Sequence, residues 1–150
     1  SATAFHWIPE KIGYPKVYRI LKSGGTFARF RNWPYKDKEN EPLHIALQKV
    51  YSKHMPYIDM STEHNEEKCI EIDDIIRKYG FIDVNFKLYH RKRTFDAESY
   101  VSLISTYSGH RALEEDKWIL FADKIEQTVN SFGGKINVYD TIDLHLARKP

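Results

Sequence analysis

The chain has 150 residues and a formal net charge of +2; 41% of its residues are hydrophobic and 14% are aromatic. This composition indicates one folded domain with a sizeable core and argues against a disordered chain. Cys69 is the only cysteine, so no intramolecular disulfide can form, and we expect a reducing, cytoplasmic compartment. The longest uncharged apolar run, Trp118–Ala122, is far shorter than the ~20 residues that span a bilayer, and we expect no membrane segment.

The first 35 residues predict a helix, a turn and a strand. We expect a short helix over Tyr14–Lys22, with Pro15 in its first turn, where the missing N–H costs nothing. Its apolar face consists of Val17, Ile20 and Leu21. The glycine pair that follows ends the helix, Thr26–Arg31 predicts a strand, and Pro34 is expected to stop it. This succession indicates one unit of a layered α/β sheet.

Two amphipathic helices and a strand follow. Helical spacing of apolar residues predicts helices over Pro42–Met55 and Asn65–Tyr79, with Gly80 at the C-terminal cap of the second. The expected buried stripes are Leu43, Leu47, Val50 and His54 in the first helix and Cys69, Ile72, Ile76 and Tyr79 in the second. Period-2 alternation predicts a strand over Ile82–Tyr89 that continues into the basic segment His90–Arg93.

The last third of the chain predicts two helices and a strand. Asp96 can cap a helix that runs to Ser105, a turn is expected over Ser105–Gly109, and a longer helix begins near Glu114. The final strand is expected over Lys135–Ala147. Its buried side is predicted to be Ile136, Val138, Ile142, Leu144 and Leu146, interrupted once by Asp140. Three strands and five helices indicate an α/β fold.

Several kinds of site have weak or absent signals. Neither GxGxxG nor GxxxxGK[ST] occurs, which excludes nucleotide binding by those loops within this chain. The seven histidines form no HExxH and no zinc-type Cys–His pairing, so we expect no metal, and we expect His145 to be a half-buried, hydrogen-bonded imidazole. Ser108 stands near His110, but GxSxG is missing, so acyl transfer is weakly indicated.

Two basic segments leave an alternative open. Arg29–Tyr35 and His90–Arg93 combine cations with aromatic rings, which could bind phosphates and stack on bases. They could equally be charged strand ends that face solvent. The small net charge favours the second interpretation.

The segment Ala4–Pro9 is a stronger candidate. Phe5, His6 and Trp7 end an apolar stretch and precede a helix, which fits the carboxyl end of a strand, where open α/β sheets bind ligands. Their rings could contact an adenine or a sulfonium. The alternative is a core aromatic cluster.

Ala4-Phe5-His6-Trp7, followed by the stretch Val17–Phe27, resembles the second half of a class I S-adenosylmethionine-dependent methyltransferase of the type 11, ubiquinone-biosynthesis or trans-aconitate-methyltransferase-like kind. In that family the first motif ends the fourth strand, and R-x-L-K-P-G-G leads from a helix into the fifth. Ser23 stands here where the family usually has proline. The resemblance extends over essentially the whole chain.

The resemblance implies a Rossmann-like fold and a place within it. Residues 1–150 would be the C-terminal portion of a methyltransferase domain: strands four to seven of a sheet ordered 3-2-1-4-5-7-6, with a helical insert and the seventh strand antiparallel. The family's glycine-rich cofactor loop has no counterpart in this sequence. We therefore expect the isolated chain to be inactive, and a homodimer or swapped assembly to form through an exposed sheet edge.

The resemblance also implies site residues. Phe5, His6 and Trp7 would lie nearest the S-adenosylmethionine, and His6 could be either a general base or a structural residue. The expected residues for a small-molecule methyl acceptor are Asn32, Trp33, Tyr35, Tyr107, Ser108 and Arg111. Arg111 could pair a substrate carboxylate or simply face solvent. The alternative function is a non-catalytic binding module, with RNA as its ligand.

Overall fold

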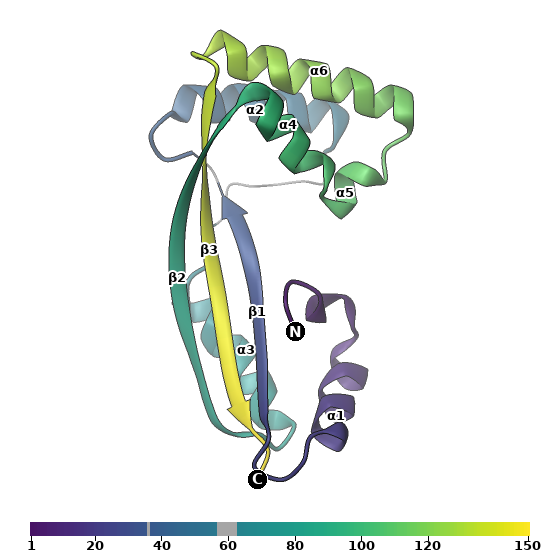
Figure 1. The fold of residues 1–150 in the computed structure, drawn as a ribbon, viewed down its shortest axis with the longest axis vertical. Helices are drawn as coiled ribbons and strands as arrows, with labels where there is room; N and C mark the ends of the chain where they lie inside the picture. Colours follow the sequence, from purple (N-terminus) through teal and green to yellow (C-terminus); the bar gives the residue numbers. More distant parts are fainter. Residues whose placement is uncertain (36, 57–62) are drawn as a thin grey trace. The chain divides into compact units, whose positions relative to one another are not determined.

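The computed structural model describes residues 1–35, 37–56 and 63–150. These residues form three strands, six α-helices and one 3-10 helix, η1 (Figure 1). In chain order the elements are η1 Phe5–Trp7, α1 Glu10–Ile20, β1 Thr26–Tyr35, α2 Glu41–His54, α3 Glu66–Lys78, β2 Ile82–Asp96, α4 Ala97–Ser105, α5 Ser108–Arg111, α6 Glu115–Ser131 and β3 Lys135–Arg148.

The strands form one sheet in the order β1-β3-β2. Gly25 O accepts from Lys149 N (2.9 Å) beside one end of β1, and the rings of Tyr35 and Tyr139 are 5.7 Å apart at the other end, so β1 and β3 are antiparallel. Figure 1 shows β2 running antiparallel to β3 as well. This is the order implied for strands five, seven and six, and the α/β, partly Rossmann-like fold class is confirmed.

A short segment at the N-terminus continues the sheet beyond β1. Ala2 forms an isolated parallel bridge with Phe30, and Thr3 N donates to Phe30 O (2.8 Å). Ala2 and Thr3 therefore lie parallel to β1, where the fourth strand would lie. The described part of that strand is a single bridge rather than a full strand. The motif Ala4–Trp7, expected to end that strand, is not extended: Phe5–Trp7 form η1, because the Phe5 ring turns into the core against Tyr14 and Phe27.

The chain divides into two compact units. The first unit comprises Ser1–Trp33, Glu63–Arg91 and Asp140–Pro150. In it, α1 and α3 share one apolar core with the strands. The buried members of this core are Phe5, Tyr14, Phe27, Ile76, Phe81 and Ala147.

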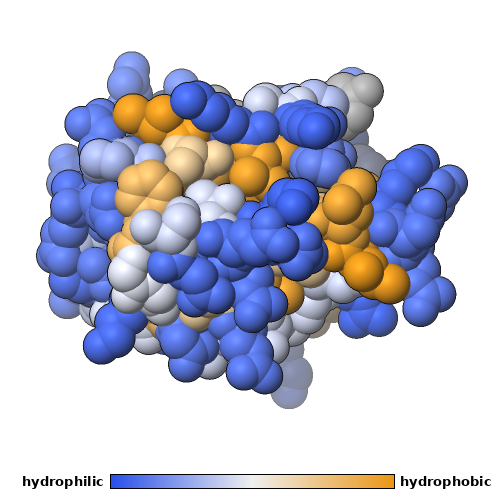
Figure 2. Space-filling model, turned by 90° about the horizontal axis from the view of Figure 1, so that it is seen from above, coloured by the Kyte–Doolittle hydropathy of each residue, from blue (hydrophilic) through white to orange (hydrophobic). Residues whose placement is uncertain are grey.

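The second unit comprises the described residues of Pro34–Thr62 together with Lys92–Tyr139. Here α2, α4 and α6 enclose a core with Ile136 and Val138 of β3. Its largest fully buried side chains are Tyr51 of α2 and Phe121 of α6. The face drawn in Figure 2 is mostly hydrophilic, with smaller hydrophobic areas between the polar side chains, as is normal for a folded surface.

Side-chain caps explain why three of the predicted helices begin where they do. Asn40, Asn65 and Asp96 accept from backbone N–H groups three residues later, at 3.1, 3.2 and 2.8 Å. Each cap satisfies one of the N–H groups that the first turn of a helix leaves unpaired. Gly80 has φ +88° after α3, the left-handed conformation that a glycine cap supplies. The predicted caps at Asp96 and Gly80 are confirmed; the caps at Asn40 and Asn65 were not predicted.

The first predicted helix is displaced. α1 begins at Glu10, four residues earlier than expected, and Pro15 lies inside it rather than in its first turn. The physical reason is tertiary packing: Gly13 and Tyr14 are buried against Phe5, so the preceding turn is held helical. Ile20, expected on the buried face, is 65% exposed.

The strand β1 continues through Pro34 to Tyr35, where a stop at Asn32–Pro34 was expected. β1 pairs with β3 on one side only. Phe30 directs its N–H and C=O to Ser1 and Thr3, away from β3, and Pro34 lies four residues further on the same side of the strand. A proline whose missing N–H faces away from the ladder costs no ladder bond.

The buried side of β3 was predicted only in part. Ile136 and Val138 are buried, but Ile142, Leu144 and Leu146 are only half-buried. In the first unit the buried residues of β3 are Asp140 and, on the odd-numbered side, Thr141, Asp143, His145 and Ala147. His145 is therefore fully buried rather than half-buried. The reason is that α3 packs on the odd-numbered side chains of β3, where Asp73 contacts His145.

Two smaller features complete the description. The expected turn over Ser105–Gly109 contains the start of a one-turn helix, α5, which the sequence pattern did not predict. Among the described residues, none of the helices combines the length and the apolar character that a membrane crossing would need.

Candidate functional site

The predicted cofactor residues line one hollow of the first unit, with a volume of about 430 Å³. η1 supplies Phe5, His6 and Trp7 to its wall. The remaining lining residues are Ile8, Pro9, Glu10, Tyr14, Arg29 and Ile75. A hollow of this size lies within the range of small-molecule sites.

Aromatic packing fixes the position of η1. The Phe5 ring lies 4.9 Å from that of Tyr14 and 5.1 Å from that of Phe27. Gly13 of α1 sits so close to Phe5 that an added Cβ would be 2.9 Å from Phe5 Cζ. Phe5 therefore belongs to the core, which was the structural alternative for this residue, and it also forms a wall of the hollow.

The charges around the hollow favour a neutral imidazole at His6. Burial and the positive charges of Arg31 and Arg29 lower the pKa of His6. A neutral imidazole at neutral pH can accept a proton. Arg29 is buried and donates from Nη1 to Tyr14 Oη (2.9 Å), which holds its charge at the wall.

The fit to S-adenosylmethionine is partial. Trp7 is 68% exposed and offers an aromatic ring, suited to an adenine or a sulfonium. Glu10 is the acidic residue of the lining, and its Oε1 already accepts from Lys78 Nζ and Tyr79 Oη, both at 2.9 Å. The hollow thus resembles one wall of a cofactor site, without a free carboxylate of its own for ribose hydroxyls.

Two predicted substrate residues donate hydrogen bonds to buried carboxylates of the first unit. Asn32 Nδ2 donates to Asp140 Oδ1 at 3.0 Å, and Trp33 Nε1 donates to Asp143 Oδ2 at 2.9 Å. Arg91 also binds Asp140, through Nε and Nη2 at 3.2 Å each. None of these residues lines the hollow beside η1.

The other predicted substrate residues belong to the second unit. Arg111 lines a hollow of about 210 Å³ together with His110 and Trp118, whereas Tyr107 packs against the core and Ser108 is exposed. Tyr35 is buried and borders a cavity of only about 20 Å³, the size of a water site. The structure does not gather all six predicted residues within one unit.

His110 does not form the base of a serine nucleophile. Its Nε2 lies 3.1 Å from Tyr51 Oη, a contact that engages this nitrogen. Burial lowers the pKa of His110 to about 4, so the ring is neutral at neutral pH. Since Ser108 is exposed while His110 is buried, the pair gives no support to acyl transfer.

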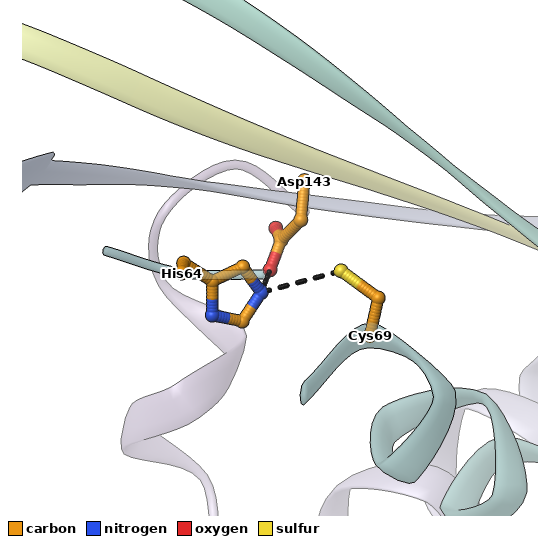
Figure 3. A group of neighbouring side chains, drawn as sticks. All are labelled: His64, Cys69 and Asp143. Carbon is orange, nitrogen blue, oxygen red and sulfur yellow. Dashed lines mark hydrogen bonds and ion pairs between the residues drawn. The ribbon is translucent and has the colours of Figure 1, made fainter. Parts of the chain in front are cut away.

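A second group of functional side chains was not predicted. In the first unit, His64, Cys69 and Asp143 meet in the interior, as Figure 3 shows. His64 Nε2 is 3.0 Å from Asp143 Oδ2 and 3.3 Å from Cys69 Sγ. The His64 ring stacks on Trp33, with centroids 4.4 Å apart.

Strong electrostatic shifts mark this buried group. Burial raises the pKa of the Cys69 thiol to about 12, and the charges of Asp143 and Asp73 act in the same direction. Burial alone would raise the pKa of Asp143, but interactions with His145, His64 and Trp33 hold it well below its usual range. The site thus carries a fixed negative charge beside an un-ionised thiol.

Weak sequence signals for this group did exist. His64 directly precedes the helix-capping Asn65, and Cys69 occupies the first turns of the helix that follows. Asp143 and His145 are two apart, so they share one face of β3. The buried side was predicted to be the opposite one, with Ile142, Leu144 and Leu146, and His145 was expected to be only half-buried.

The comparisons with known proteins give solved structures only. No family model matches the chain, and no curated protein matches it. The chain is similar to a proposed methyltransferase from Bacillus halodurans, at 18% identity and a TM-score of 0.46, with 99% of this chain and 67% of that one covered. It is similar to Haemonchus contortus phosphoethanolamine N-methyltransferase 2 in complex with phosphomonomethylethanolamine and S-adenosylhomocysteine, at 16% and 0.41, covering 100% and 32%.

A third similar structure is a proposed type II methyltransferase from Anaeromyxobacter dehalogenans, at 13% identity and a TM-score of 0.48, with 98% of this chain and 62% of that one covered. The chain spans about a third of the Haemonchus protein and about two thirds of the Bacillus and Anaeromyxobacter proteins. All three are described as methyltransferases. Identities this low do not carry an activity across to this chain.

Proposed function

We propose that the chain takes part in S-adenosylmethionine-dependent methyl transfer to a small-molecule acceptor, as the C-terminal portion of a methyltransferase domain. The observation that carries the proposal is the strand order β1-β3-β2 with β3 antiparallel. This order is what the resemblance of Ala4–Trp7 and Val17–Phe27 implies for the last three strands of that family. The parallel bridge between Ala2 and Phe30, just before η1, supports the proposal, because the resemblance implies a strand parallel to β1 on this side.

The residues of the hollow have definite parts in this proposal. S-adenosylmethionine would supply an electrophilic methyl group, and the exposed ring of Trp7 would cover the adenine or the sulfonium. His6, whose pKa is lowered by burial and by Arg31 and Arg29, would hold the proton that a hydroxyl or amine acceptor releases. Phe5 would exclude water from the wall of the hollow and keep η1 in place.

The proposal predicts weak cofactor binding and no activity for the isolated chain. The glycine-rich loop that holds the cofactor in this family has no counterpart in the sequence. We therefore expect the chain alone to bind S-adenosylmethionine weakly and to be inactive. The buried, unpaired thiol of Cys69 favours a reducing, cytoplasmic compartment.

The RNA-binding alternative gains no support from the side chains that it needs. Arg31 stacks on Trp33 at 3.6 Å, and Trp33 stacks in turn on His64. Arg29 is buried against Tyr14, and Lys92 forms an ion pair with Glu39 at 2.6 Å. Rings and cations that are already paired within the protein offer little to bases and phosphates, so we do not propose this function.

The deciding experiment examines the natural polypeptide that contains this sequence. We expect an antibody against the chain to detect a longer product with a glycine-rich loop ahead of residue 1, and that product to transfer a labelled methyl group to a small molecule. His6→Gln should lower its turnover by about 10²–10⁴-fold if His6 is the base. Trp7→Ala should weaken cofactor binding, whereas the matched control Ile20→Ala, exposed on α1 and outside the hollow, should not.

Two results would contradict the proposal. One is micromolar binding of S-adenosylmethionine by the present chain alone, since the chain would then hold a complete cofactor site. The other is a natural product that neither binds S-adenosylmethionine nor transfers a methyl group.

A further inference from the structure

Three potential metal-ligand atoms of different chemistry converge on one interior point of the first unit (Figure 3). His64 supplies Nε2 from the residue before the cap of α3, Cys69 supplies Sγ from the first turns of α3, and Asp143 supplies a carboxylate oxygen from β3. The three atoms all lie within 4.8 Å of one another. The three residues are 0–2% exposed.

The geometry does not fit a nucleophilic relay. In a relay, the nucleophile and the acid contact opposite nitrogens of the histidine. Here Cys69 Sγ and Asp143 Oδ2 both approach Nε2 of His64, which can carry only one proton, while the buried Nδ1 has no hydrogen-bond partner. Complete burial also denies a substrate access to the thiol.

His145 provides an independent observation that points to a ligand. This side chain is fully buried, and its Nε2 has no hydrogen-bond partner. That nitrogen lies 3.7 Å from Asp143 Oδ2. Its other nitrogen, Nδ1, is 2.7 Å from Asp73 Oδ1 of α3. A histidine that binds a metal through one nitrogen characteristically donates from the other nitrogen to a carboxylate.

We propose that His64, Cys69 and Asp143 bind a zinc ion, with His145 Nε2 as the fourth ligand. One sulfur, two imidazole nitrogens and one carboxylate oxygen form a donor set that Zn²⁺ accepts in a tetrahedron. Binding of the ion would release the proton of the Cys69 thiol, and the negative charges of the resulting thiolate and of Asp143 would balance the ion. Since all four positions are taken by the protein in a closed interior, this is a structural site, distinct from the hollow beside η1.

The distances from His64 to the other two clustered ligands agree with this assignment, whereas His145 Nε2 lies outside the group of ligand atoms within 4.8 Å of one another. Zinc bonds of about 2.0–2.1 Å to nitrogen and oxygen and about 2.3 Å to sulfur place tetrahedral N and O ligands about 3.3 Å apart and N and S ligands about 3.6 Å apart. The corresponding distances here are 3.0 Å for His64 to Asp143 and 3.3 Å for His64 to Cys69. Small outward shifts of His64, Cys69 and Asp143 would admit the ion, and a shift of His145 toward it would complete the tetrahedron.

The surroundings hold the ligands in position. The backbone N–H of Arg31 donates to Asp143 Oδ1 at 2.8 Å, and Trp33 Nε1 donates to Oδ2 at 2.9 Å. The stacked Trp33 ring orients His64, and Asp73 orients His145. An ion at this point would join α3 to β3, with β1 supporting the site from its side.

The test uses the full chain, freed of metal by a chelator under reducing conditions and titrated with Co²⁺ and then Zn²⁺. We expect one ion per chain, with visible bands of tetrahedral cobalt and a thiolate-to-cobalt charge-transfer band in the near ultraviolet that Zn²⁺ removes. Because Cys69 is the only cysteine, that band identifies its ligand without any variant. Zn²⁺ should also raise the thermal unfolding midpoint.

Variants separate the ligands from their supports. Cys69→Ser should abolish the charge-transfer band and weaken Zn²⁺ binding at least 100-fold, and Asp73→Asn should weaken it about 10–100-fold while the band remains. The control His90→Gln changes a histidine of the same unit outside the cluster and should leave both unchanged. Absence of the charge-transfer band in the wild-type chain, or unchanged zinc affinity in a folded Cys69→Ser variant, would overturn the proposal.

Discussion

The contact between Gly13 and Phe5 allows a quantitative test of how the hollow is built. A Cβ at Gly13 would lie 2.9 Å from Phe5 Cζ and 3.2 Å from Ile8 Cγ2, closer than carbon atoms normally approach. Gly13→Ala should therefore force the Phe5 ring or α1 to move. Overpacking of this kind costs about 1–3 kcal/mol.

A second effect acts in the opposite direction. Alanine is more favourable than glycine within a helix by about 1 kcal/mol, and Gly13 lies inside α1. The net expectation is a loss of about 1 kcal/mol in the free energy of unfolding, or about 2–4 °C in the unfolding midpoint of a chain of this size. Thermal and urea unfolding followed by circular dichroism would measure it.

A double-mutant cycle isolates the contact itself. Phe5→Leu removes Cζ, so adding Gly13→Ala to that variant should cost nothing and should show the gain in helix propensity. We expect a coupling free energy of about 1–2 kcal/mol, within the range for residues in contact. A Gly13→Ala variant as stable as the wild type, with no coupling to Phe5→Leu, would refute the packing described for η1.

Three further predictions concern other parts of the molecule. The pKa of His110 is about 4 in the folded chain and about 6.5 in the unfolded chain, so the unfolded chain binds the proton more readily. The free energy of unfolding should therefore fall as the pH drops from about 6.5 to about 4. In urea titrations over the same pH range, the His110→Gln variant should lose less stability than the wild type. Asp96→Ala removes the cap on Ser99 N and should cost about 1 kcal/mol in thermal unfolding, whereas Asp74→Ala, which breaks an exposed ion pair with Arg77, should change stability by less than about 0.5 kcal/mol. Assembly through the outer sheet edge beside Ser1–Ala4 should appear as a dimer in sedimentation at high concentration, and a monomer at every concentration would contradict it.

The sequence predicts the helices whose determinants are local. α2, α3, α4 and α6 agree with prediction to within one or two residues, because apolar spacing and capping side chains act within a few residues of one another. The strand order follows from the resemblance and not from any local pattern. No periodicity in the chain indicates that β3 pairs between β1 and β2.

Elements that depend on tertiary contacts were misplaced. The start of α1 depends on Phe5, which packs against Gly13 across the turn, and the passage of β1 through Pro34 depends on that strand having β3 on one side only. Proline was interpreted by its average behaviour in both elements. Its effect depends on whether a partner for its missing N–H would have existed at that position.

The candidate sites also differ in whether local sequence or tertiary contacts determine them. Phe5, His6 and Trp7 are consecutive, so a short motif was enough to predict that they would line a common wall. The proposed zinc ligands come from a loop end, a helix and a strand, separated by up to 81 positions between His64 and His145. No spacing rule connects such residues, because only the pairing of β3 beside β1 and the packing of α3 bring them together.

The burial of polar groups on β3 has a physical consequence for the first unit. Asp143 and His145 occupy core positions where apolar side chains would carry no desolvation penalty. Each of them needs a hydrogen-bond or metal partner to offset the free energy of removing it from water. Asp143 has donors from Arg31, Trp33 and His64, but Nε2 of His145 and Nδ1 of His64 have none. An ion bound at the proposed site would satisfy the first of these nitrogens and leave His64 Nδ1 as its proton-bearing atom. The zinc titration and the unfolding experiments therefore bear on one question: what offsets the cost of a polar core at this point.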